Sequence, residues 1–257
     1  MKQRKQHTKL YISTAFVVIL AALLALLPLG KKQAQEPMVE VLAPMDTLVT
    51  ATVQPLSPTA QYLDSLGYIN ITEQDKNIFV SLMYARADNF TGEVLYTELK
   101  EAYLHPDAMQ CLLKAQQLLK AGHPELTLAV FDAARPMSVQ QKMWNTVKGT
   151  AKQNYVSNPA RGGGMHNYGV AVDITLATSD GDTLPMGTKI DHLGKEANIS
   201  QEASLVRQGK MSAKAWENRK LLREVMTKAG FKTLPSEWWH FNLVSRNEAK
   251  QRYKLIP

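Results

Sequence analysis

One stretch of this sequence combines a histidine with an acid in a pattern suited to metal binding. Residues 161–176 are RGGGMHNYGVAVDITL, with His166 seven residues before Asp173. The alternation over residues 170–176 predicts a strand in which Asp173 is the single carboxylate among apolar side chains. Burying that charge alone is costly, so a metal or another cation must balance it. A structural aspartate with a hydrogen-bonded histidine nearby fits the stretch equally well.

A second cluster, SEWWHF over residues 236–241, places Glu237 three residues before His240. In a regular strand these two side chains would face opposite ways, so the backbone must bend near Trp238 if both act on one metal. Imidazole nitrogen and carboxylate oxygen are zinc ligands, and a catalytic zinc site keeps one position for water. A packed strand with a satisfied core histidine is the alternative.

The elements expected around these residues indicate an α+β domain. Strands are predicted over residues 75–85, 126–134, 170–176 and 236–244, and helices over residues 106–120, 139–147 and 216–229. Ser138 and Gln141 fit a capping box at the start of the second helix. Gly122 and Gly230 are expected to end the other two helices.

Residues 1–34 predict a signal peptide or an N-terminal membrane anchor. Lysines and arginines precede an apolar run over residues 10–29, which is about the length that spans a bilayer. No convincing cleavage site follows, which favours an uncleaved anchor over a removed signal. The domain is then exported and either periplasmic or membrane-anchored, facing the cell-envelope space. Residues 35–65, rich in Pro, Thr and Gln, predict an extended tether to a domain over residues 66–257.

Composition and the absence of one motif argue against three other classes of protein. The net charge is +7, but six basic residues precede the first acid, Glu36, so the remaining chain is nearly neutral and nucleic acid is not an expected partner. The single cysteine, Cys111, lies in an apolar helical pattern that predicts a core residue rather than a nucleophile. No Gly-x-Ser-x-Gly turn is present, which excludes that type of serine hydrolase.

Together the two clusters resemble the motif pattern of a peptidase family. His-x-x-Gly-x-Ala-x-Asp, followed about 60 residues later by Glu-x-x-His, is similar to the zinc D-Ala-D-Ala peptidases, which include D,D-carboxypeptidases and Hedgehog-like domains. More narrowly, the chain resembles VanX-type dipeptidases of peptidase family M15. Three further stretches match: YARADNFTG at 84–92, DAARP at 132–136 and MGTKID at 186–191. The resemblance covers about residue 66 to the C-terminus and implies an antiparallel sheet flanked by helices, with a zinc site on the sheet.

The resemblance also implies roles for individual residues. Three match the family's zinc ligands: His166, Asp173 and His240. Glu237 matches the base that takes a proton from water and passes it to the leaving amine, while zinc lowers the pKa of that water to about 7. Arg135 matches the arginine that stabilises the developing oxyanion, and a salt bridge with Asp132 is its alternative role.

Substrate recognition involves two further positions and one departure from the family. Asp191 matches a position near the substrate ammonium, and Tyr84 is expected to line the same pocket. The family usually has serine two residues before the first histidine, where this chain has Gly164, so strict preference for dipeptides stays open. Three histidines lack a motif partner and are not expected to touch the metal: His105, His123 and His192.

The resulting hypothesis is zinc-dependent hydrolysis of D-Ala-D-Ala or related dipeptides outside the cytoplasm, in peptidoglycan turnover. The partner is thus a small peptide from peptidoglycan. One alternative is a D,D-carboxypeptidase or endopeptidase acting on longer muropeptides. Another is a non-catalytic, zinc-stabilised binding module. A dipeptidase needs the free ammonium of its substrate, so cleavage of N-acylated D-Ala-D-Ala separates the first two hypotheses.

Overall fold

The computed structural model describes residues 55–257, and the predicted leader and the tether up to residue 54 lie outside them. Each helix within the described range is too short or too polar to cross a bilayer. The helices are α1 (Pro58–Ser65), α2 (Ile71–Gln74), α3 (Pro106–Gly122), α4 (Met137–Val147), α5 (Glu202–Arg207), α6 (Ala213–Ala229) and α7 (Arg246–Arg252). The strands are β1 (Ile69–Asn70), β2 (Phe79–Val80), β3 (Tyr103–Leu104), β4 (Leu126–Asp132), β5 (Ala171–Thr178), β6 (Lys232–Leu234) and β7 (Glu237–Asn242).

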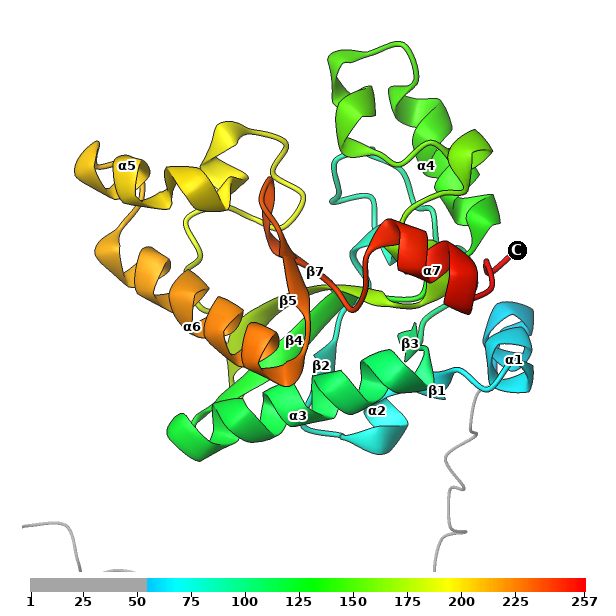
Figure 1. The fold of residues 1–257 in the computed structure, drawn as a ribbon, viewed down its shortest axis with the longest axis horizontal. Helices are drawn as coiled ribbons and strands as arrows, with labels where there is room; N and C mark the ends of the chain where they lie inside the picture. Colours follow the sequence, from blue (N-terminus) through cyan, green and yellow to red (C-terminus); the bar gives the residue numbers. More distant parts are fainter. Residues whose placement is uncertain (1–54) are drawn as a thin grey trace, which may run out of the picture. The chain divides into compact units, whose positions relative to one another are not determined.

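A five-stranded sheet lies between the helices (Figure 1), with the strand order β2-β4-β5-β7-β6. The pairs β4–β5, β5–β7 and β7–β6 are antiparallel, while β2 joins β4 in parallel at one edge. A separate two-stranded sheet pairs β1 with β3. The expected α+β fold, with a largely antiparallel sheet flanked by helices, is confirmed.

One face of the sheet packs on α3 and α6, which lie side by side (Figure 1). On β5, Val172, Ile174 and Leu176 are fully buried in the main hydrophobic cluster, together with Leu112 of α3 and Leu222 of α6. Burial of each such side chain contributes about 1.5–3 kcal/mol. Because side chains alternate along a strand, the polar residues of β5 lie on its opposite face. The helices therefore fix the sheet from one side and leave the other for a site.

The two long helices follow their sequence signals closely. Ser212 caps α6 by accepting a hydrogen bond from the Ala215 amide at 3.1 Å, and Gly230 ends it at φ 117°. The capping box predicted at Ser138 is wrong, because α4 already begins at Met137 and Pro136 occupies the cap position. Ser138 therefore lies inside the first turn.

The strand predicted over residues 75–85 is reduced to the two residues of β2. Among the described strands this edge strand pairs only with β4, and residues 83–85 form a 3-10 helix that contains the buried Tyr84. The predicted tether also differs at its end, since Pro58–Ser65 form α1. Ser57 caps this helix, and Ala60 and Leu63 are fully buried in the core, so the packed domain starts before residue 66.

Candidate metal centre and active site

The polar face of the sheet brings the three predicted metal ligands together. Asp173 on β5 lies directly opposite His240 on β7 in the antiparallel register. His166 follows the glycine-rich loop on a 3-10 turn that ends at Gly169, whose φ of 65° favours glycine. A Cβ at that position would lie 2.2 Å from a Tyr68 ring carbon and 3.3 Å from the His105 backbone nitrogen, so this close packing requires glycine. The glycine loop thus folds the histidine back toward the strand, as expected.

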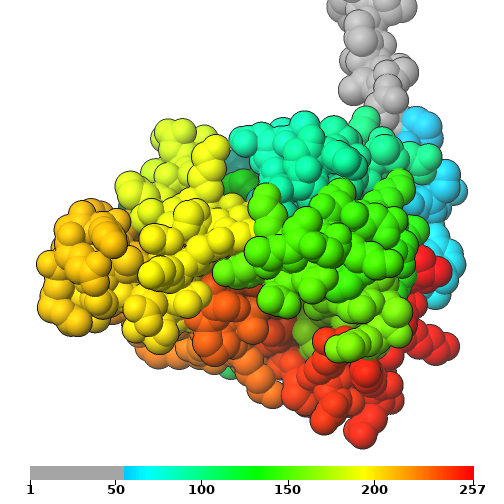
Figure 2. Space-filling view, turned by 90° about the horizontal axis from the view of Figure 1, so that it is seen from above, coloured from blue at the N-terminus to red at the C-terminus, as the bar shows by residue number. Residues whose placement is uncertain are grey.

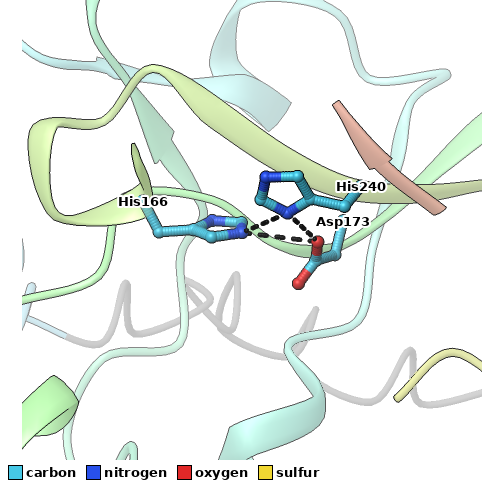
Figure 3. Close-up of side chains that lie close together, drawn as sticks. All are labelled: His166, Asp173 and His240. Atoms are coloured by element: carbon cyan, nitrogen blue, oxygen red, sulfur yellow. Dashed lines mark hydrogen bonds and ion pairs between the residues drawn. The ribbon is translucent and has the colours of Figure 1, made fainter. Parts of the chain in front are cut away.

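The donor atoms of these residues lie at the spacing of metal ligands (Figure 3). His166 Nε2 lies 3.2 Å from His240 Nδ1 and 3.3 Å from Asp173 Oδ1, and His240 Nδ1 lies 2.9 Å from the same oxygen. In tetrahedral coordination, two ligand atoms that each lie about 2.1 Å from a zinc ion are separated by about 3.4 Å. The arrangement fits a tetrahedral ion with three protein ligands and a fourth position for water or substrate.

The outer nitrogens of both imidazoles are occupied, which directs the inner ones toward a shared point. His166 Nδ1 lies 2.7 Å from the carbonyl oxygen of Ala133, to which it donates. His240 Nε2 lies 2.8 Å from Asn242 Oδ1. With the outer nitrogens acting as donors, the inner nitrogens carry the lone pairs that a metal needs. Asn242 was not predicted, although its position two residues after His240 on a strand places both on one face.

Buried charge makes a cation necessary at this point. Burial opposes ionisation of Asp173, yet the charges and hydrogen bonds of His166 and His240 hold the pKa of this carboxyl below its ordinary range. Burial alone would lower the pKa of His240, but Asp173 raises it to about 9. A proton or a metal ion therefore balances the carboxylate, and metal binding would release that proton. The residues present fit a divalent metal.

Glu237 lies beside the metal group at a break in the strand register. Thr233 pairs with Phe241, whereas the next residue of β6, Leu234, pairs with Glu237 itself. This shift is the local irregularity required for positions 237 and 240 to share one site, and Glu237 Oε2 lies 4.0 Å from His240 Nδ1. Burial raises the pKa of the Glu237 carboxyl, which suits a group that must both accept and return a proton.

Arg135 makes the salt bridge with Asp132 that was considered as its alternative role, and it does so at the wall of the pocket. Its Nε donates to Asp132 Oδ2 at 3.0 Å, and a second, shorter bond joins Nη2 to the same oxygen. Its Nη1 donates to Gln140 Oε1 at 2.9 Å, and the guanidinium also lines the pocket. Burial alone would lower its pKa, but the charge of Asp132 raises it well above the ordinary value. The salt bridge therefore holds a charged arginine at the pocket wall.

Asp191 and Tyr84 also meet in this pocket. The Tyr84 hydroxyl donates to Asp191 Oδ1 at 3.0 Å. The other carboxyl oxygen, Oδ2, is buried and has no hydrogen-bond partner among residues 55–257. Burial and the charge of Asp173 raise the pKa of Asp191 to about 8. Among the described residues, Asp191 is also the one non-glycine residue with a positive φ, at 64°. A strained carboxyl with an unpartnered buried oxygen at the pocket wall is a candidate group for binding a substrate donor.

The pocket has a volume of about 190 Å³ and lies where the segment around α4 meets the segment after β5. These two segments, green and yellow in Figure 2, lie next to each other on the side of the molecule that carries α4 and α5. Ser157 and Arg246 are among the residues of its wall that were not predicted from the sequence. A Cβ at Gly164 would lie 2.9 Å from Ser157 Oγ, so Ser157 fills the space beside this glycine.

The other three histidines within residues 55–257 lie apart from the metal group. His105 caps α3 by accepting a hydrogen bond from the Asp107 amide at 3.2 Å, and His123 ends the same helix. His192 lies 3.1 Å from Glu196 on the surface. Each of them has a local partner.

Comparison with known proteins identifies the family. Residues 64–256 match the model of the M15 peptidases, described as D-Ala-D-Ala dipeptidase. The chain is 34% identical to a D-alanyl-D-alanine dipeptidase of Escherichia coli (strain K12), an alignment that covers 70% of this chain and 86% of that protein. It is 26% identical to a D-alanyl-D-alanine dipeptidase of Enterococcus faecium, over 69% of this chain and 92% of that one. The family predicted from the motifs is confirmed. The chain belongs to the D-Ala-D-Ala dipeptidase family of M15 peptidases and is a peptidase.

Proposed function

We propose that this peptidase hydrolyses D-Ala-D-Ala or closely related dipeptides, with a zinc ion held by His166, Asp173 and His240. The observation that carries the proposal is the combination found in one pocket. A three-residue metal group lies beside half-buried Glu237, and Asp191, which has one buried carboxyl oxygen without a partner among residues 55–257, lines the same cavity. A structural metal site needs neither a base nor a cation-binding carboxyl.

The chemistry follows from the positions of two charged residues. Zinc, when bound, lowers the pKa of water to about 7 and polarises the scissile carbonyl. Glu237 takes the water proton and delivers it to the leaving amine, and its raised pKa makes the return step easier. Arg135 keeps its charge and donates to the carbonyl oxygen as negative charge builds there. Losing such a donor typically costs about 10²–10³ in rate.

The two ends of a free dipeptide find opposite charges along the pocket. The substrate ammonium would bind the Asp191 carboxyl and favour its ionised form. Arg246 supplies a cation for the carboxylate: its Nη2 donates to the carbonyl oxygens of Arg161 and Gly163, at 3.0 and 2.7 Å. No acidic side chain within residues 55–257 forms an ion pair with it. A cavity of about 190 Å³ is below the roughly 300–1,000 Å³ of pockets for drug-sized ligands, in keeping with a small substrate.

One observation favours the alternative of longer muropeptides. A wider groove of about 870 Å³ adjoins the pocket, and the two share Tyr155, Ser157, Glu237 and Arg246 in their walls. A peptide extended past the metal group would find room in this groove. The same groove would also admit water and product.

We place this activity outside the cytoplasm, because the basic start and apolar run over residues 1–34 are typical of an export signal or anchor. There the enzyme would act on dipeptides released in peptidoglycan turnover, either in salvage or in trimming. Recovery of the active protein in the cytosolic fraction of its host would contradict this location.

The experiment assays the purified full-length chain on free D-Ala-D-Ala and on its N-acetylated form, with bound metal measured in parallel. Cleavage of the free dipeptide alone supports a dipeptidase. Equal cleavage of the acetylated form moves the assignment to a D,D-carboxypeptidase. The control is Glu237→Gln, which should retain zinc and lose at least about 10² in kcat. Zinc binding without turnover of either substrate would leave only a binding module.

A further inference from the structure

Arg219 on α6 is a buried cation that the chemistry above does not use. It is 1% exposed. Burial lowers its pKa to about 10, against the opposing charge of Glu202, so it stays protonated at neutral pH. A buried guanidinium must have its donors satisfied, and the acceptors it uses show what it holds in place.

The hydrogen bonds of Arg219 reach the loop that carries Asp191. Its Nε donates to the carbonyl oxygen of Met186 at 2.6 Å, and its Nη2 donates to Thr188 Oγ1 at 3.4 Å. Its Nη1 donates to the carbonyl oxygen of Glu196 at 3.1 Å. These acceptors lie on both sides of Asp191 in the sequence. One planar side chain therefore clamps the two arms of this loop.

The loop that Arg219 holds contains a strained backbone position, Asp191. A non-glycine residue at φ 64° is strained and persists only where surrounding contacts enforce it. The hydrogen bond from Tyr84 holds the side chain of Asp191, but the backbone on either side is held by Arg219. Its neighbour Asn218 adds a bond to the carbonyl oxygen of Pro185 at 2.8 Å.

Arg219 also contacts the support of the catalytic base. Its guanidinium carbon lies 5.1 Å from the ring centre of Trp238, in cation–π geometry. The Trp238 indole N–H donates to Thr188 Oγ1 at 2.8 Å. Arg219 of the helix, Thr188 of the loop and Trp238 of the strand therefore all contact one another. Trp238 follows Glu237 directly, at the register shift of β7. The same side chain thus supports the neighbours of both Asp191 and Glu237.

A purely structural ion pair is the competing explanation. Arg219 Nη1 lies 3.7 Å from Glu202 Oε1, but Glu202 is already held by both terminal nitrogens of Arg223, at 3.1 and 2.8 Å. Arg223 shares this acid, and within residues 55–257 its side chain forms no hydrogen bond or ion pair with the loop or with Trp238. The two arginines therefore form a matched pair for separating the explanations.

We propose that Arg219 is a positioning residue that holds Asp191 toward the substrate ammonium and Glu237 toward the metal centre. The substrate part rests on the proposed function, whereas the anchoring of the loop does not. A lysine at this position keeps the charge but cannot span three acceptors and stack on an indole, so Arg219→Lys tests geometry rather than charge.

The test compares full-length wild type, Arg219→Lys and Arg223→Gln, each with zinc content measured. The kinetic readout is the ratio of kcat/KM for D-Ala-D-Ala to that for N-propionyl-D-alanine, which lacks the ammonium. Loss of supporting contacts around a site typically costs 10- to 100-fold, so this ratio should fall about tenfold or more in Arg219→Lys. It should stay at the wild-type value in Arg223→Gln. Amide hydrogen exchange over residues 186–196 should accelerate only in the first variant.

An unchanged ratio and unchanged exchange in zinc-loaded Arg219→Lys would overturn the proposal, as would equal effects in Arg223→Gln. If wild type cleaves neither substrate, the proposed function fails, while the exchange data still decide whether Arg219 anchors the loop. If Arg219→Lys does not fold, Thr188→Val removes the shared acceptor at nearly the same volume. It should change the ratio and the exchange in the same direction.

Discussion

Replacing Asp191 by asparagine should make the protein more stable while it weakens substrate recognition. The pocket raises the pKa of this carboxyl from 3.8 to about 8, through burial first and the charge of Asp173 second. Between these values the folded protein keeps a proton that the unfolded chain releases. Stability therefore falls as pH rises from about 4 to about 8, and the amide, which cannot ionise, escapes this loss.

The size of the effect follows from the shift. Each pH unit inside the window changes the free energy of unfolding by at most about 1.4 kcal/mol. From pH 5 to pH 7, Asp191→Asn should thus gain up to about 2.7 kcal/mol over wild type. A dication bound in the same pocket favours the ionised carboxyl, so the gain should be smaller with zinc than with a chelator present.

Urea unfolding at pH 5, 6 and 7 measures this difference directly. Asp88→Asn is the matched control, because Asp88 pairs with Lys189 on the surface, where both side chains are more than four-fifths exposed. Its difference from wild type should not vary over this pH range. A constant difference between Asp191→Asn and wild type would refute the account of Asp191. In the dipeptide assay the variant should lose activity on D-Ala-D-Ala far more than on N-propionyl-D-alanine.

Three further substitutions test other contacts of the site. Asn242→Ala removes the acceptor that orients one imidazole and should weaken zinc binding about 10- to 100-fold in competition with a chelating dye. Arg246→Gln should raise KM for D-Ala-D-Ala about tenfold but leave KM for its C-terminal amide unchanged, whereas Arg161→Gln should change neither. Gly164→Ala should cost about 1–3 kcal/mol in urea unfolding, because its Cβ would meet the Ser157 hydroxyl at 2.9 Å, and adding Ser157→Gly should restore most of it.

The sequence allowed the long elements and the metal group to be predicted for the same reason. Both are marked by regular patterns in the sequence, such as the helical spacing of apolar residues in α3 and α6 or the alternation in β5. The single carboxylate in β5 marked Asp173 as the residue that needs a cation. The spacing of His166 and His240 around it gained meaning only through the family motifs, since strand pairing across 67 residues has no local signal.

Short elements and residues whose positions depend on tertiary contacts were not predicted from the sequence. The helices α1, α5 and α7 and the strand β6 are short, and their own sequences carry little periodicity. Arg219 belongs to no motif, and nothing in its neighbours along the helix indicates that a loop covers it. Arg246 and Ser157 reach the pocket from segments that matched no motif.

The metal group joins segments that are distant along the chain. His166 and His240 are separated by 74 positions, and the chain has a single cysteine, so no internal disulfide can close such a loop. An ion bound to these residues would act as a reversible cross-link between the glycine-rich loop and two neighbouring strands. In chain-entropy terms, closing a loop of that length is worth about 4 kcal/mol. The supply of metal would therefore set how long the folded protein survives heat and proteolysis, as well as how fast it works.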